Sequence, residues 1–142
     1  MTPELRQKLR SLLTQHEQFR QFPYNDQTGH LTIGIGRNLT DRGISQTDAF
    51  ALLDDDISYF YSRLKSACNY FDALDDNRKI ALVDMCFNLG VNGFLGFHDM
   101  QSAMERGDYE MAAQEMLDSK WATQVGERAI TLANIVRTGE LI

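Results

Sequence analysis

The sequence predicts a mostly helical α+β fold with a β-hairpin in its N-terminal third. Apolar residues recur every three or four positions over most of the chain, which is the period of an amphipathic helix. Residues 22–35 instead alternate apolar and polar residues around a turn-forming segment, which is typical of paired strands. At 142 residues the chain has the length of one domain, and two lobes that share one long helix also fit.

The composition excludes several classes of protein. With 43% hydrophobic residues the chain can form a packed core. Its net charge of −6 argues against binding nucleic acid independently of sequence and provides no attraction to anionic membranes or cell walls. No stretch approaches the roughly 20 apolar residues that span a bilayer, and the N-terminus resembles an amphipathic helix rather than a signal peptide. We therefore expect a soluble chain, made in the cytoplasm, without stable membrane insertion or nucleic acid as a partner.

The first predicted helix spans about residues 3–15. Thr2 is a suitable N-cap, and Pro3 fits the first helical position, where an N–H is not needed. Four leucines occur at spacings that place them on one face, which we expect to be buried: Leu5, Leu9, Leu12 and Leu13.

The predicted hairpin follows this helix. Pro23 disfavours further helix. Residues 22–24 and 30–35 are the predicted strands, and residues 25–29 form the turn, in which Gly29 can adopt positive φ.

Helices account for the rest of the chain. Ser45 and Asp48 resemble a capping box that begins a helix over about 46–71. Its apolar residues follow at spacings of three and four: Phe50, Leu53, Ile57, Phe60, Leu64, Ala67 and Phe71. This helix is long enough to connect two lobes. The next helix, which ends at Gly90, is apolar nearly all round and is therefore expected to be the central buried helix. Two short helices over 99–106 and 109–119 and a final helix from Thr123 complete the chain.

The two cysteines, Cys68 and Cys86, lie among apolar residues of helical segments, without the CxxC or Cys/His spacing of a metal site. We interpret them as small buried hydrophobic residues. A disulfide between them stays open at this point.

Three residues of the hairpin region carry candidate chemistry. Hydrolysis of a glycoside generally needs one protonated and one ionised carboxyl group. Glu17, near Phe19 and Phe22, is a candidate for the acid held protonated by partial desolvation. Asp26, in the turn, has surroundings that favour the ionised form, and the hydroxyl of Thr32 on the facing strand can orient a water. Each residue alone also has an ordinary structural explanation: a solvated helix residue, a turn aspartate and a strand former.

The combination resembles a known family. Glu17, Asp26 nine positions later and Thr32 six further, followed by IGIG, resemble the catalytic signature of glycoside hydrolase family 24, the phage-type lysozymes or endolysins. Three further segments resemble family motifs, in the same order: MCFNLGVNGFLGF, SKWATQVGERA and VRTGE. The resemblance implies a small lobe with the hairpin (about 14–50), a connecting helix (about 46–71) and a larger helical lobe (about 72–142, with the helix over 3–15). It places the substrate cleft between the lobes.

The resemblance also implies an activity, cleavage of the β-1,4 bond between N-acetylmuramic acid and N-acetylglucosamine in peptidoglycan. Glu17 would be the general acid, and Asp26 with Thr32 would activate water. The usual outcome in the family is inversion, for which the carboxyl groups stand roughly 6.5–9.5 Å apart. No metal or organic cofactor is expected.

Other residues are implied by matching position. Arg128 would reach Glu17 across the cleft, although a solvated helix arginine is an equally good interpretation of the residue alone. Phe87 and Asn88 would contact sugar on the cleft floor, and Phe87 is equally explained as a core residue. Arg37 stands where a familiar member of the family has histidine, and Asp56 occupies the position of its acidic partner. We therefore predict an ion pair between Arg37 and Asp56.

The expected biological role is that of a phage or prophage endolysin. The chain would act as a monomer on peptidoglycan glycan strands. It would be made in the host cytoplasm and would reach the periplasm with the help of a holin. Two alternatives stay open: a bacterial muramidase that serves as an effector or remodels the wall, and a non-catalytic peptidoglycan-binding module on the same fold.

Overall fold

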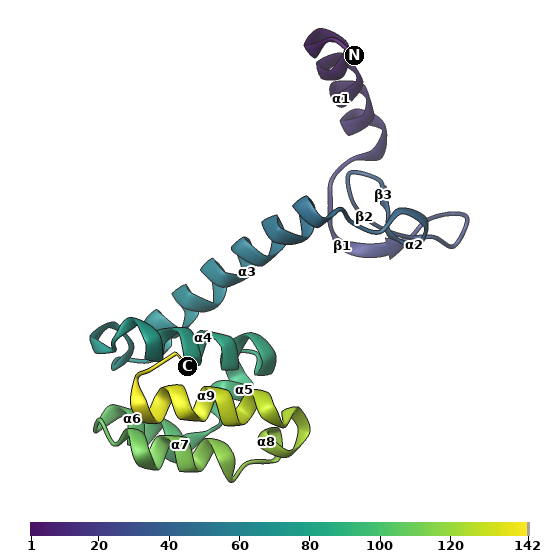
Figure 1. Cartoon of the computed structure of the whole chain (residues 1–142). Coiled ribbons are helices and arrows are strands. Elements are labelled where there is room, and N and C mark those ends of the chain that lie inside the picture. Colours follow the sequence, from purple (N-terminus) through teal and green to yellow (C-terminus); the bar gives the residue numbers. More distant parts are fainter. Residues whose placement is uncertain (142) are drawn as a thin grey trace. The chain divides into compact units, whose positions relative to one another are not determined.

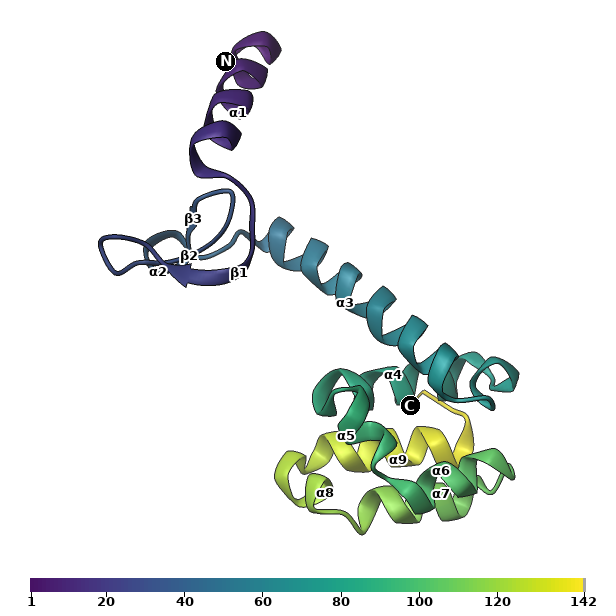
Figure 2. The same ribbon diagram turned by 180° about the vertical axis from the view of Figure 1, so that it is seen from behind.

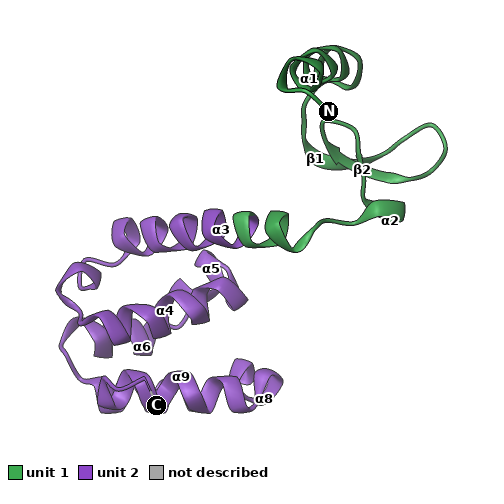
Figure 3. Ribbon diagram, turned by 45° about the horizontal axis from the view of Figure 1, so that its top comes forward, with its two compact units in different colours: residues 1–51 green, residues 52–142 purple. Residues whose placement is uncertain are grey.

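The structure of the protein, a computed structural model, describes residues 1–141. Figures 1 and 2 show a chain dominated by helices, with one small antiparallel sheet near the N-terminus. The mostly helical α+β prediction is therefore confirmed. The chain divides into two compact units, which are coloured separately in Figure 3: unit 1 is Met1–Ala51, and unit 2 runs from Leu52 to the C-terminus. The lobe boundaries that the family resemblance implies stay predictions.

Unit 1 begins with the predicted amphipathic helix, α1 (Pro3–Glu17). The hydroxyl of Thr2 accepts a hydrogen bond from Leu5 N at 3.1 Å, and Pro3 occupies the start of the helix, as its fixed φ favours. Unit 1 itself does not cover the leucine face, because α1 contains no buried residue and its four leucines are 43–50% exposed; the expected burial of this face stays a prediction. Within unit 1 only Thr32 is buried among the described residues, so this unit has no apolar core on which the face can pack.

A three-stranded antiparallel sheet follows α1, in the order β1–β2–β3. The predicted hairpin is formed by β1 (Arg20–Asn25) and β2 (Leu31–Gly34), with Tyr24 opposite Thr32. The third strand, β3 (Arg37–Asn38), was not predicted, since two residues are too few to show an alternating pattern. The short helix α2 (Leu39–Arg42) was also missed; it is capped by the Asn38 side chain, which accepts from Asp41 N at 3.0 Å.

The long predicted helix is present as α3 (Gln46–Ala67), which begins in unit 1 and continues into unit 2. It ends before Phe71, which instead starts a 3₁₀ turn, η1 (Phe71–Ala73). Its apolar seam is buried at Leu64, whereas Phe50 and Ile57 are 56% and 44% exposed. Periodicity located the helix correctly but did not show how much of its face would be covered.

The remaining helices form unit 2. These are α4 (Asp76–Leu89), α5 (Val91–Leu95), α6 (His98–Glu105), α7 (Tyr109–Leu117), α8 (Lys120–Val125) and α9 (Glu127–Thr138). The final predicted helix is in fact two, α8 and α9, because Gly126 adopts a φ of +60° between them.

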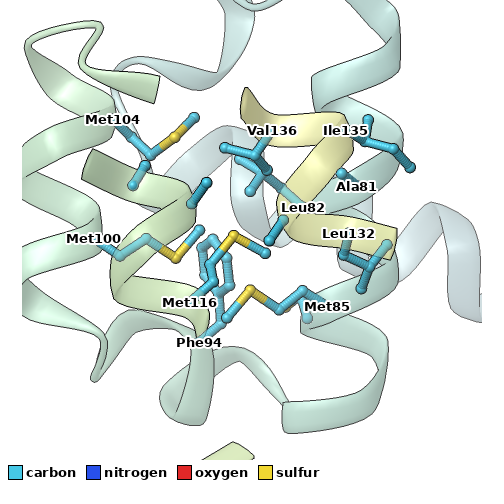
Figure 4. Packing of buried hydrophobic residues seen from close by; sticks show 14 of the residues in the cluster. Ala81, Leu82, Met85, Phe94, Met100, Met104, Met116, Leu132, Ile135 and Val136 are labelled. Carbon is cyan, nitrogen blue, oxygen red and sulfur yellow. The ribbon is translucent and has the colours of Figure 1, made fainter. Parts of the chain in front are cut away.

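The hydrophobic core lies in unit 2. Figure 4 shows side chains from α4, α6, α7 and α9 that meet around Phe94. Four buried methionines contribute to this core, and their flexible thioethers fill irregular space between helices: Met85, Met100, Met104 and Met116. The prediction that α4 is the central buried helix holds for only part of its surface. Ala81, Leu82, Met85 and Cys86 are buried, but Ile80 is 49% exposed.

Two further observations concern the sequence predictions. Cys68 and Cys86 are buried and free, so the structure has no disulfide between them. Burial raises the pKa of the Cys86 thiol to about 11, as expected for an inert interior cysteine.

None of the helices among residues 1–141 is long and apolar enough to cross a membrane.

Candidate active site

Asp26 has the most elaborate surroundings of the three catalytic candidates. It lies at the start of the turn between β1 and β2, and its Oδ1 accepts three hydrogen bonds. The donors are His30 N at 2.8 Å, Thr28 N at 2.9 Å and Thr28 Oγ1 at 2.8 Å. These bonds, chiefly those from His30 N and the Thr28 hydroxyl, hold the pKa of Asp26 below its ordinary value of 3.8. The sequence-based expectation of an ionised turn aspartate agrees with this geometry.

Thr32 lies on the same hairpin and is 4% exposed. On β2 it faces Tyr24 of β1 and Asn38 of β3. Its hydroxyl donates to the carbonyl oxygen of His30 at 3.0 Å. The peptide groups of His30 therefore bind both candidates, since its N–H holds Asp26 and its C=O holds Thr32.

Glu17 is the last residue of α1 and packs against Gly36. A Cβ added to Gly36 would lie 2.7 Å from Glu17 Cδ and 2.8 Å from Oε2, so a glycine is needed here to leave room for the carboxyl group. The expected desolvation of Glu17 is not observed. Glu17 is exposed, and the two phenyl rings expected to shield it, Phe19 and Phe22, are 70% and 72% exposed. The predicted separation of the Glu17 and Asp26 carboxyl groups stays a prediction.

Within unit 1, Arg37 forms an ion pair with Asp48, an acid that the sequence analysis did not single out. Its Nη1 lies 3.7 Å from Asp48 Oδ2 and donates to the carbonyl oxygen of Gly43 at 3.1 Å. Asp48 lies in the first turn of α3, whereas Asp56 lies eight residues later, or about 12 Å along the helix axis. The predicted pair of Arg37 with Asp56, which lies in unit 2, stays a prediction. Within unit 1 the guanidinium contacts the loop at Gly43 and the first turn of α3 at Asp48.

Unit 2 brings Arg128 and Phe87 to one groove of about 640 Å³ between α3, α4 and α9. Arg128 is bound within this unit: its Nε and Nη2 lie 2.8 and 2.7 Å from Asp84 Oδ1, and Nη2 donates to the Asp84 carbonyl oxygen at 3.2 Å. Phe87 is 40% exposed and packs at 5.5 Å, between ring centroids, from Phe60. The predicted contact of Arg128 with Glu17 stays a prediction.

Asn88, unlike Phe87, does not line this groove. It is exposed, and its Oδ1 accepts a hydrogen bond from Trp121 Nε1 at 2.7 Å. This contact ties the end of α4 to α8 and satisfies the indole N–H of a buried tryptophan.

Sequence reasoning missed several residues that shape these sites. Thr28 and His30 follow Asp26 at intervals of two, a spacing from which side-chain-capped turns can be recognised. Asp84 had no comparable signal, because it lies 44 residues from Arg128 in the chain.

Among residues 1–141, no group of three or more His, Cys, Asp or Glu side chains is arranged to bind a metal ion.

The sequence matches one family model and is similar to several known proteins. A sequence model described as "Phage lysozyme" matches residues 14–137. The chain is 32% identical over 112 residues to the pre-baseplate central spike protein Gp5 of Enterobacteria phage T4; the match covers 75% of this chain but only 20% of Gp5. It is 27% and 25% identical, over 147 residues, to two proteins of Dictyostelium discoideum, probable T4-type lysozymes 1 and 2. Each of these matches covers 83% of this chain and 86% of the relative.

The family match includes the hairpin with Asp26 and Thr32, as well as Arg128 in α9, and it covers most of the chain. The Dictyostelium relatives are similar over most of their own length. The chain therefore belongs to the phage lysozyme family, and it is an enzyme of the glycoside hydrolase class, a lysozyme.

Proposed function

We propose that the enzyme is a muramidase, which hydrolyses the β-1,4 bond between N-acetylmuramic acid and N-acetylglucosamine in peptidoglycan. The observation that carries this proposal is the carboxylate of Asp26, whose Oδ1 accepts three hydrogen bonds and whose pKa is lowered. An aspartate that stays ionised in mildly acidic and neutral solution is the partner that a general acid needs in glycoside hydrolysis.

In the proposed mechanism Glu17 protonates the leaving glycosidic oxygen, while Asp26 accepts a proton from the attacking water. The three donors occupy Oδ1 of Asp26, so Oδ2 is the oxygen best able to bind that water. Thr32 donates its hydroxyl proton to His30 O and can therefore offer the water only its lone pairs. The same water would give one hydrogen bond to Asp26 and one to Thr32, which fixes its orientation.

This assignment of roles makes the reaction inverting. Asp26 acts through water and not as a nucleophile, so attack occurs on the face of the sugar opposite the leaving group. The sugar configuration at the cleaved bond changes from β to α.

The groove of unit 2 is proposed to contribute to glycan binding. Phe87 exposes part of its ring beside Arg128, and such a combination of an apolar face with a hydrogen-bond donor suits a sugar ring. Asn88 would add a polar contact through the amide NH₂, because its Oδ1 is bound to Trp121. The Arg128–Asp84 pair keeps the guanidinium in place in the absence of substrate.

The biological role we propose is lysis of a host cell by a phage or prophage endolysin. The enzyme would act in the periplasm as a monomer, after release through the inner membrane with the help of a holin. Family membership and similarity to a phage protein support this role, although the Dictyostelium relatives belong to a different kind of organism. Genes for a holin or spanins beside the coding sequence would favour the endolysin, whereas genes for a secretion system would favour a bacterial effector.

The enzymatic proposal is tested by clearing of outer-membrane-permeabilised Gram-negative cells. We expect the wild type to clear the suspension and Glu17→Gln to lose at least about 100-fold of the rate, as is typical for removal of a general acid. Glu4→Gln is a matched control, because Glu4 lies in the first turn of the same helix and undergoes the same chemical change.

Either of two results would overturn the proposal. The first is that the wild type binds peptidoglycan without clearing, which is the behaviour of a non-catalytic module. The second is that Glu17→Gln and Glu4→Gln clear equally fast.

A further inference from the structure

The imidazole of His30 lies between two carboxylates of unit 1. Its Nδ1 is 3.5 Å from Asp26 Oδ2, and its Nε2 is 3.4 Å from Asp41 Oδ2. The side chains of His30 and Asp26 are each 36% exposed, and that of Asp41 is 59% exposed. In the part of the chain that the structure describes, Asp26 from the β1–β2 turn and Asp41 from α2 are the charged groups that face this ring.

The hydroxyl of Thr28 connects the ring to the other oxygen of Asp26. Thr28 Oγ1 lies 2.8 Å from Asp26 Oδ1 and 2.6 Å from His30 Nδ1. A hydroxyl has one proton to donate. If Thr28 donated that proton to the imidazole, its oxygen would face an ionised carboxylate oxygen with no proton between them. The proton therefore goes to Asp26, and His30 Nδ1 donates its own proton to the hydroxyl oxygen.

The far side of the ring is held by Asp41. Asp41 Oδ2 lies 3.4 Å from His30 Nε2 and limits the rotation of the ring on that side. Asp41 is itself fixed: Asn38 Nδ2 donates to its Oδ2 at 3.0 Å, and its backbone N–H donates to Asn38 Oδ1 at 3.0 Å. A bond from Leu31 N to Thr40 Oγ1, at 2.8 Å, also ties α2 to β2.

We propose that His30 is a positioning residue for Asp26, acting through the Thr28 hydroxyl and held from behind by Asp41. This inference rests on the proposed function, in which Asp26 activates water. The bonds running from Asp41 through His30 and Thr28 fix the rotation of the Asp26 carboxylate, so that Oδ2 is presented to the water. His30 contributes twice, because its backbone N–H also binds Asp26 Oδ1 and is unchanged by side-chain substitution.

The test uses paired variants of Thr28 and His30. Thr28→Val keeps the side-chain shape but removes the hydroxyl, whereas Thr28→Ser keeps the hydroxyl. His30→Leu removes both ring nitrogens, whereas His30→Asn returns an N–H at a position close to that of Nδ1. His98→Leu is the control, since His98 is an exposed histidine of α6, outside the site.

We expect Thr28→Val and His30→Leu to lower kcat on peptidoglycan about 3- to 10-fold with little change in KM, the effect of losing one of the hydrogen bonds that hold the Asp26 carboxylate directly or through Thr28. In Thr28→Val the acidic limb of the kcat profile moves to higher pH, because Asp26 loses a donor that favours its ionised form. In His30→Leu the limb moves in the same direction but less far, because the Thr28 hydroxyl remains and loses only the bond that orients it toward Asp26. Thr28→Ser and His30→Asn restore most of the rate and the position of the limb. His98→Leu behaves as the wild type.

A measurement of the imidazole by ¹⁵N NMR gives a readout independent of activity. The chain has three histidines, and the His30 signals are those lost in His30→Leu. We expect a proton on Nδ1 of His30 in the wild type. The neutral ring with its proton on Nε2 alone would contradict the inference.

Kinetic failure of this inference is distinguishable from failure of the proposed function. If Asp26→Asn abolishes activity while Thr28→Val and His30→Leu keep the wild-type kcat and acidic limb, His30 does not position Asp26, and the muramidase mechanism stands. If Asp26→Asn itself keeps full activity, the mechanism is wrong, and the role of His30 falls with it.

Discussion

Replacement of Gly36 by alanine is expected to displace the proposed general acid with little damage to the fold. The new Cβ would lie 2.7 Å from Glu17 Cδ, whereas carbon atoms in ordinary contact are about 3.5 Å apart. The Glu17 carboxyl group must therefore move by roughly 0.8 Å, the difference between these distances. Because the clashing atoms belong to a flexible side chain, the displacement relieves the clash but misplaces the acid.

Gly34→Ala is the matched control. Gly34 has a φ of +71° and Gly36 a φ of +70°, so alanine is strained to a similar extent at both positions, by roughly 1–2 kcal/mol. A Cβ at Gly34, however, would meet no atom within 4 Å. The difference between the two variants therefore isolates the displacement of Glu17.

The assay combines kcat for peptidoglycan hydrolysis with the free energy of unfolding in urea. We expect both variants to lose similar stability, and Gly36→Ala to lose about 10- to 100-fold more kcat than Gly34→Ala, since a displacement near 1 Å can reduce catalysis by about two orders of magnitude. Equal kcat in two folded variants would refute the placement of Glu17 as the acid.

Three further predictions follow from the structure. Asp26 has a lowered pKa in the folded state, so its stabilising contribution is present above pH 3.8 and is lost as the pH falls through the folded-state pKa; urea unfolding of wild type and Asp26→Asn should converge at low pH. Arg78 donates from Nε to Val136 O at 2.7 Å, and its guanidinium lies 3.7 Å from the Tyr109 ring centroid. Replacing Arg78 by methionine should therefore lower the free energy of unfolding by about 2–3 kcal/mol, and replacing it by lysine should lower it less. Cys86, buried and with a pKa of about 11, should react with a thiol reagent only when urea unfolds the chain; fast labelling of the folded protein would contradict its burial.

The candidate acid, base and hydroxyl were proposed from sequence on their resemblance to a family signature, which can be recognised because its three residues lie within 16 positions of one another. Glu17, Asp26 and Thr32 are separated by a helix end and a hairpin, both of which have strong local signals: Pro23, the turn residues and an alternating strand. The hydrogen bonds that Thr28 and His30 make to Asp26 belong to the same turn and follow from its local geometry.

Contacts between distant segments were less predictable. The pairing of Arg37 with Asp48 depends on where the loop over 38–44 places the start of α3. The pair formed by Arg128 and Asp84 joins two helices whose packing is decided by the core of unit 2. Periodicity cannot supply such information, because it reports which residues share a face and not what that face meets.

The same limit applies to the burial of apolar helix faces. The leucines of α1 share a face, as their spacing predicts, but unit 1 has no apolar core beneath them. Along α3 the apolar seam continues through residues such as Phe50 and Ile57 that are exposed in the structure. A helical pattern of apolar residues is a sound indication of secondary structure and a weaker one of burial.

The most direct test of the proposed mechanism is proton NMR of the glycan fragments at the moment of their release. The account predicts new reducing ends on N-acetylmuramic acid that appear first as the α anomer, because water activated by Asp26 attacks opposite the leaving group. Absence of new reducing ends would contradict the enzymatic role. The β anomer as the first product would contradict the role of Asp26 as a base acting through water.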